Sequence, residues 1–120
     1  MLKNRRLRLL RFFDDHDLDL LLIEHARNLR YLAGFSGSEG CLVLRRDGGW
    51  FVCDSRYTVQ AGAEVQGLVV VEQAQRLEAV ADLAGQCGAR RIGFEAAHTT
   101  VSRHQELVSR LPEVVLVPLG

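Results

Sequence analysis

The stretch Asp54-Ser55-Arg56-Tyr57 places an acid, a cation and two hydroxyl groups side by side in the sequence. Asp54 follows an apolar run, a position where a carboxylate accepts hydrogen bonds from the free backbone N–H groups that begin a helix. Arg56 would then lie in the first helical turn, where the helix dipole disfavours a cation. We therefore expect Arg56 to bind a carboxylate, either in this domain or on a substrate or another subunit.

The segment from Gly34 to Gly40, GFSGSEG, is rich in glycine and serine. It leads into an apolar, strand-like run and lacks the lysine of a phosphate-binding loop. Neither Ser36 nor Ser38 fits the G-x-S-x-G turn that presents a serine nucleophile. The glycines instead favour a tight turn in which backbone segments approach closely.

Histidine and cysteine spacing does not indicate a metal site. No two histidines are four residues apart on a predicted helix, and no cysteines form a C-x-x-C pair. We interpret Cys41, Cys53 and Cys87 as reduced core residues, as in a cytoplasmic protein. His25 lies between a predicted strand and a predicted helix, so it should face the same edge of the fold as the glycine segment.

Composition excludes two classes of partner. The chain has 120 residues with 15 basic and 15 acidic side chains, so its formal net charge is zero. That balance does not favour nucleic acid or an anionic membrane surface. No apolar stretch approaches the roughly 18 residues that a membrane span needs, and arginines interrupt the apolar N-terminal region. The length suits one domain.

Helical and strand patterns alternate along the chain. Apolar spacing predicts helices at 2–13, 27–33, 55–64, 76–87 and about 100–111. Short apolar runs predict strands at 18–23, 41–45, 50–53, 68–71, 91–94 and 114–117. The Asp47-Gly48 step indicates an antiparallel hairpin, and the strict alternation after it indicates parallel strands. We expect a three-layer α/β domain with a mixed, mostly parallel sheet.

Two ordered motifs carry a resemblance to a known family. Residues 28–44, NLRYLAGFSGSEGCLVL, resemble the segment N-I/V-x-Y-L-x-G-F-S/T-G-S-x-G/A of the creatinase/prolidase N-terminal domain, and DSRYTVQA resembles its D-G/S-R-Y-x-x-Q-A segment. RRIGFEAAHTT is similar to the family's R-I-G-x-E strand and following turn. Many members have proline where this chain has Ala26. The motif residues are Asn28, Tyr31, Gly34, Phe35, Gly37, Gly40 and Asp54.

The resemblance implies a ribonuclease H-like topology and an accessory role. Family members are cytoplasmic metallopeptidases that cleave Xaa-Pro peptides or dipeptides. They use two divalent metal ions (manganese, cobalt or zinc) held in a C-terminal pita-bread domain. None of those ligands maps onto this sequence. We therefore expect residues 1–120 to be one non-catalytic domain, without its catalytic domain and with no catalytic residue, metal ligand or cofactor of its own.

The resemblance also implies partners. These are the domain's own C-terminal catalytic domain, a second subunit of a homodimer, and a proline-containing peptide whose route to the metal site the domain narrows. The candidates for contacting the substrate or the interface are Arg56, Tyr57, Ser36, Ser38 and His25.

Two alternatives remain open from the sequence. One is a peptide- or protein-binding module of a catalytically inactive homologue, as in a histone chaperone subunit that carries a related domain. The other is the accessory domain of a creatinase-type hydrolase. The residues encoded after Gly120 would separate all three.

Overall fold

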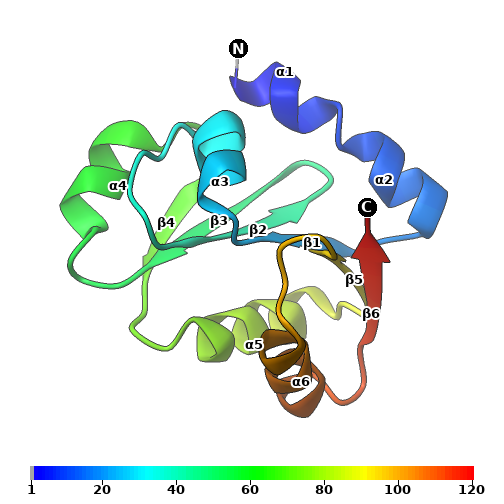
Figure 1. The fold of residues 1–120 in the computed structure, drawn as a ribbon. Helices are drawn as coiled ribbons and strands as arrows, with labels where there is room; N and C mark the ends of the chain where they lie inside the picture. The colour runs from blue at the N-terminus through cyan, green and yellow to red at the C-terminus, as the bar shows by residue number, and fades with distance from the viewer. Residues whose placement is uncertain (1) are drawn as a thin grey trace.

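The computed structural model describes residues 2–120 as twelve elements around one sheet (Figure 1). In chain order these are α1 (Leu2–Leu7), α2 (Leu10–His16), β1 (Leu20–Ile23), α3 (Ala26–Ala33), β2 (Cys41–Arg45), β3 (Gly48–Cys53), α4 (Thr58–Glu64), β4 (Val69–Glu72), α5 (Arg76–Cys87), β5 (Arg91–Glu95), α6 (Val101–Arg110) and β6 (Val115–Leu119).

The six strands of the described chain form one sheet in the order β4-β3-β2-β1-β5-β6. β2 pairs antiparallel with both β1 and β3, whereas the β3–β4, β1–β5 and β5–β6 pairs are parallel. Within this sheet, five strands therefore run in one direction and β2 runs against them. This confirms the predicted mixed, mostly parallel sheet with its hairpin.

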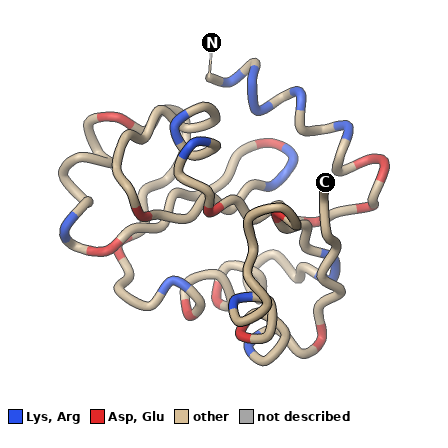
Figure 2. Tube along the Cα trace, viewed as in Figure 1, with Lys and Arg blue, Asp and Glu red and all other residues tan. Residues whose placement is uncertain are grey.

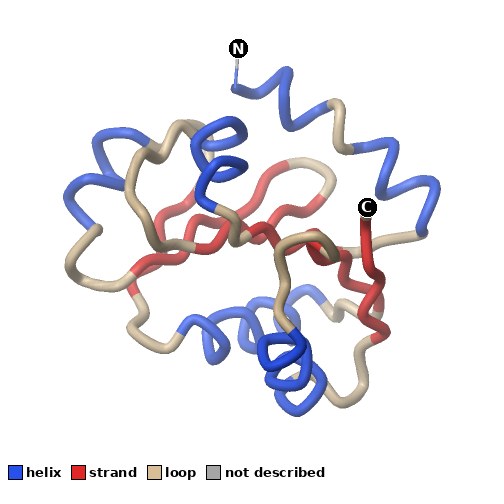
Figure 3. The backbone as a smooth tube through the Cα atoms, viewed as in Figure 1, coloured by secondary structure: helices blue, strands red, loops and turns tan. Residues whose placement is uncertain are grey.

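Helices cover both faces of the sheet, which confirms the three layers (Figures 1 and 3). Side chains alternate along β1, so Leu21 and Ile23 pack beneath α2, α3 and α4, while Leu20 and Leu22 pack against α5 and α6. All four are buried, because a central strand of such a sheet has no solvent face.

The N-terminal helix is broken, contrary to the prediction of one helix over 2–13. α1 ends at Leu7, and the Leu9 N–H donates to the Arg6 carbonyl at 3.0 Å in a tight turn before α2 begins. The two halves have different partners. Arg5 and Arg6 of α1 donate to carbonyls at the end of α3, whereas α2 buries Phe13 in the core under the sheet.

Two further predictions were wrong in detail. The helix expected from Ser55 begins at Thr58, because residues 55–57 form a turn in which the Tyr57 N–H donates to the Asp54 carbonyl at 3.0 Å.

Cys41 and Cys53 are buried as expected, but Cys87 is exposed at the end of α5. Burial raises the pKa of the Cys41 thiol well above its ordinary value, which suits an inert core residue.

Replacing Phe51 with alanine should destabilise the domain more than any exposed truncation. Its ring is fully buried and packs at a tilt against Phe35 with centroids 4.5 Å apart. We expect the free energy of unfolding in urea to fall by about 3–5 kcal/mol. Val59→Ala, at a side chain that is 88% exposed, is the matched control and should change it by less than about 0.5 kcal/mol. Equal effects of the two substitutions would contradict this account of the core.

Candidate functional site

Four segments meet at one edge of the sheet because β2 runs against its neighbours. The chain leaves β1 and β3 at the edge where it enters β2, and β5 is parallel to β1, so it ends there too. We call these segments, residues 24–25, 34–40, 54–57 and 95–98, the loop edge. In α/β sheets the carboxyl edge of the parallel strands is where ligands usually bind.

The glycine segment of the loop edge is fixed by Phe35. Gly34 ends α3 in the left-handed conformation, with φ of 81°, and its N–H donates to the Arg30 carbonyl. The chain then buries the Phe35 ring completely, edge-on to Tyr57 at 5.7 Å between centroids. Gly37 lies directly over this ring, where an added Cβ would be 2.4 Å from Phe35 Cζ. The motif residues Gly34, Phe35 and Gly37 therefore form and stabilise this turn.

The segment ends at Gly40, which is buried just before β2. Its carbonyl accepts a hydrogen bond from Arg76 Nη1 at 2.9 Å, and Arg76 also lies 3.8 Å from the Glu24 carboxylate. Glu24 is held more closely by Arg103, with an Nη2–Oε2 distance of 2.5 Å. Arginines from α5 and α6 thus tie the loop edge to the helices of the other layer.

Both serines of the glycine segment are bound within the domain. Ser36 donates its N–H and its hydroxyl to Glu64 at the end of α4, at 2.9 and 2.8 Å. These hydrogen bonds, the backbone one first, lower the pKa of Glu64. The hydroxyls of Ser38 and Tyr57 are 2.9 Å apart. Within the described residues neither serine is hydrogen-bonded to an imidazole, so neither has the base that a nucleophile needs.

Arg56 binds acids of its own domain. Its Nη2 is 2.7 Å from Asp54 Oδ2 and 2.5 Å from Glu39 Oε2, and its Nε donates to Asp54 Oδ1 at 3.0 Å. Asp54 also accepts the Arg56 N–H at 2.9 Å, so it caps a turn rather than the predicted helix. The hydrogen bonds to Arg56 lower the pKa of Asp54, and those to Asp54 and then Glu39 raise the pKa of Arg56.

This trio, Arg56 with Asp54 and Glu39, still has a hydrogen-bond donor that a ligand can use. Arg56 is 64% exposed, and in residues 2–120 its Nη1 has no hydrogen-bond acceptor, so it can donate to an incoming carbonyl or carboxylate. The two carboxylates outnumber the one guanidinium, which leaves the turn with a net negative charge. Such a surface can orient a polar peptide by hydrogen bonds, but it supplies no nucleophile.

Asn28 and Glu95 hold the other half of the loop edge together. Glu95, the last residue of β5, accepts the N–H groups of Glu24 and His25 at 2.6 and 3.0 Å and the Asn28 side-chain amide at 2.6 Å. The carboxylate thereby satisfies backbone donors ahead of α3. Ala26 is the first helical residue, a position that also accepts proline, so alanine there is compatible with the same helix start.

His25 and Tyr31 do not join the Arg56 trio. The His25 ring stacks on His98 with centroids 3.6 Å apart, and its Nδ1 is buried without a hydrogen-bond partner in the described residues. Tyr31 is 46% exposed on α3, and the Arg5 guanidinium lies 4.6 Å from its ring centroid. His25 lies at the loop edge as expected, and Tyr31 contacts α1 instead.

Sequence reasoning missed three acids on which this geometry depends, namely Glu39, Glu64 and Glu95. Glu39 and Glu95 lie within motif segments, and an acid directly after a buried strand could have drawn attention to Glu95. Glu64 ends a helix, and nothing in its spacing connects it to Ser36. The described residues contain no group of three or more His, Cys, Asp or Glu side chains arranged to hold a metal ion. The implied metal pair therefore has no fitting set of ligands among residues 2–120. No helix in this part of the chain is long and apolar enough to cross a membrane.

Residues 5–120 match the family model of the Creatinase/Prolidase N-terminal domain. The chain belongs to this family. An uncharacterized peptidase of Bacillus subtilis (strain 168), YqhT, is 33% identical over 109 residues, which are 90% of this chain and 31% of that protein. The chain therefore spans about a third of the length of this relative.

Solved structures show the same domain. An Xaa-Pro dipeptidase from Bacillus anthracis matches this chain with 25% identity and a TM-score of 0.93. The match covers all of this chain and 34% of the dipeptidase. The N-terminal domain of the cytoplasmic peptidase PepQ from Mycobacterium tuberculosis H37Rv matches 98% of this chain over 93% of its own length, with 32% identity and a TM-score of 0.89. The chain is thus homologous to N-terminal domains of Xaa-Pro peptidases.

Removing the Glu95 side chain should loosen the start of α3. Glu95→Ala leaves three donors without an acceptor, so we expect a loss of about 2–3 kcal/mol in the free energy of unfolding. Amide hydrogen exchange at residues 24 and 25 should accelerate. Glu113→Ala, at an exposed loop position, is the control and should change neither quantity. Unchanged exchange in Glu95→Ala would refute this role.

The acid titration of Asp54 should depend on Arg56. In the folded chain the pKa of Asp54 is lowered, so its ion pair contributes stability above the ordinary pKa of aspartate, and this contribution is lost as pH falls through the lowered value. Arg56→Gln should move the pKa of Asp54 upward in an NMR titration. Arg8→Gln, which removes an exposed arginine elsewhere, should leave it in place. An Asp54 pKa that is equal in both variants would contradict the assignment.

Proposed function

We propose that this chain is the non-catalytic N-terminal domain of an Xaa-Pro peptidase, of the aminopeptidase P or prolidase type. The observation that carries the proposal is the share of a full-length relative that this chain covers. All of this chain matches the Bacillus anthracis dipeptidase, but the match covers only 34% of that enzyme. The remaining two-thirds of such an enzyme is where we place the chemistry, in a pita-bread domain that holds two divalent metal ions.

The loop edge is the surface that we assign to the substrate entrance. Its serines, Tyr57 and Asp54 are engaged in hydrogen bonds within the domain, which hold the edge in place and pair neither serine with a base. A rigid, polar lip next to a metal site would limit peptide length and direction, which accelerates a reaction by positioning. The same edge would contribute to a homodimer if it lines the entrance of the neighbouring subunit.

Arg56 is the residue that we expect to contact the peptide, through its free Nη1. Asp54 and Glu39 hold the guanidinium from one side, which fixes its direction before substrate arrives. Tyr57 supports the same turn through Ser38 and Phe35. We place the enzyme in the cytoplasm, in keeping with the description of the Mycobacterium relative as a cytoplasmic peptidase.

The test is steady-state kinetics on the protein expressed from its whole gene. With manganese it should release the N-terminal residue from an Xaa-Pro peptide or split an Xaa-Pro dipeptide, and residues 1–120 alone should not. Arg56→Ala should raise KM or lower kcat by about tenfold, the value of one charge-assisted hydrogen bond of about 1.4 kcal/mol.

Two controls separate contact from structure in this experiment. Arg110→Ala removes an exposed arginine that is also ion-paired, to Glu78, and should leave the kinetics unchanged. Circular dichroism should show Arg56→Ala folded. Turnover by residues 1–120 alone, or lack of peptidase activity in the whole protein, would overturn the proposal, and unchanged kinetics in Arg56→Ala would remove Arg56 from the entrance.

A further inference from the structure

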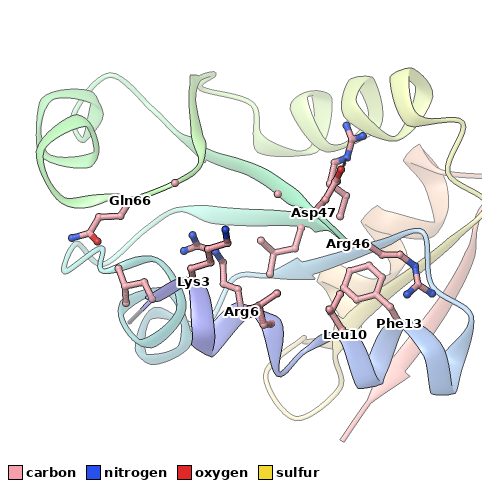
Figure 4. A pocket seen from close by; sticks show the side chains of 13 residues that line it. Lys3, Arg6, Leu10, Phe13, Arg46, Asp47 and Gln66 are labelled. Carbon is pink, nitrogen blue, oxygen red and sulfur yellow. Dashed lines mark hydrogen bonds and ion pairs between the residues drawn. The ribbon is translucent and has the colours of Figure 1, made fainter.

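A groove separates the N-terminal helices from the β2–β3 hairpin, at the opposite end of the strands from the loop edge (Figure 4). Its volume is about 640 Å³. Aliphatic and aromatic side chains form its apolar wall, and they come from α1, α2 and β2: Leu2, Leu7, Leu10, Phe13 and Leu44. Leu7 is 47% exposed and Leu2 and Leu10 are half-buried, whereas Phe13 and Leu44 are buried at the base of the groove. A partner could therefore contact the wall through its three leucines from α1 and α2.

The groove is strongly basic for a chain with no net charge. Four cations and a single acid line it, namely Lys3, Arg6, Arg45, Arg46 and Asp47. Arg45 is paired with Asp47, and Arg46 with Asp14. Lys3 and Arg6 have no carboxylate within 4.0 Å in residues 2–120. Figure 4 shows both on α1 beside the groove, and the Arg6 guanidinium lies next to Gly67. Figure 2 marks several Lys and Arg positions along the backbone of the N-terminal helices.

Arg6 is the cation best placed to bind an anion. Its guanidinium is partly buried, donates to the Leu32 carbonyl through Nη1 at 2.9 Å, and so is held in one position. Burial lowers the pKa of Arg6, which reflects the cost of a charge that has lost water without gaining a counter-ion. Its Nη2 faces Gly67, where an added Cβ would be only 2.7 Å away. Glycine at this position leaves Nη2 accessible.

We propose that this groove binds an acidic amphipathic helix of a protein partner. The partner's leucine-type side chains would lie on the apolar wall, and its carboxylates would meet Arg6 and Lys3. Charge complementarity selects this occupant, because unpaired cations beside exposed Leu7 and half-buried Leu2 and Leu10 match a helix with acidic residues along the rim of its apolar face. Binding would supply the counter-ion that Arg6 lacks.

The probe is a dye-labelled synthetic helix of about 18 residues, with leucine at helical spacing and glutamate beside it. Its binding to the whole protein is measured by fluorescence anisotropy, against a version with every glutamate replaced by glutamine. We expect the acidic peptide to bind at least tenfold more tightly. In amide NMR spectra of the labelled protein, shifts should concentrate on α1, α2 and residues 44–48.

Variants test the two cations directly. Arg6→Gln and Lys3→Gln should each weaken binding by about two- to fivefold, the range for one partly exposed ion pair. Arg11→Gln removes an exposed arginine on α2 that does not line the groove, and it should have little effect. Gly67→Asn keeps all cations and tolerates the left-handed backbone at φ of 72°, yet it covers Arg6 and should weaken binding as Arg6→Gln does.

Several results would overturn the proposal. These are absence of binding, equal affinity for the glutamine peptide, equal losses in Arg6→Gln and Arg11→Gln, or shifts that map outside the groove. Binding to phosphatidylserine vesicles but not to the peptide would assign the basic helices to a membrane surface instead. Concentration-dependent dimerisation that Gly67→Asn abolishes would assign the groove to a second copy of the chain.

Discussion

The direction of β2 is the constraint on which the rest of the structure depends. Because β2 is hydrogen-bonded between β1 and β3 and runs against both, the chain must return to the carboxyl end of β1 before it can enter β2. α3 and the glycine segment make that return. The β2–β3 hairpin then turns at Arg46 and Asp47 and brings the chain back to the same edge at Asp54. Two motifs separated in sequence thereby face each other.

Polar groups at this edge are arranged to hold positions. Glu95 accepts hydrogen bonds from three donors at the start of α3, Glu64 binds Ser36, and Asp54 with Glu39 holds Arg56. Buried Phe35 and Phe51 lie beneath these contacts, so the exposed turn rests on a packed core. A surface whose donors and acceptors are mostly paired internally resists deformation and retains only a few directed groups. That is the physical basis for assigning it to substrate positioning.

The sequence predicts the architecture well because local signals agree with the tertiary structure. Apolar runs mark the strands, Gly34 and Gly88 end their helices in the left-handed conformation, and Thr100 caps α6 as its type predicts. The break between α1 and α2 was not predictable, because it arises from packing against two different surfaces. The start of α4 was misplaced because an aspartate after a strand can cap a turn as readily as a helix.

The candidate site was predicted only in part for the same reason. Arg56 was expected to need an acid, but its partner Glu39 and the roles of Glu64 and Glu95 depend on which segments the sheet brings together. Family motifs named Asn28 without its partner Glu95, which lies 67 residues away. Residue spacing along the chain does not predict such contacts, because the strand order determines which distant segments meet.

The central claim is that the loop edge faces a peptide bound in a peptidase site carried by the rest of the protein. Hydrogen–deuterium exchange of the whole gene product, with and without a slowly hydrolysed Xaa-Pro peptide, tests it most directly. If the loop edge faces the peptide, exchange at residues 36–39 and 54–57 should slow when the peptide is bound, and exchange in the hairpin at 45–48 should stay unchanged. Protection confined to the hairpin, or exchange at the loop edge that does not respond to the peptide, would contradict it.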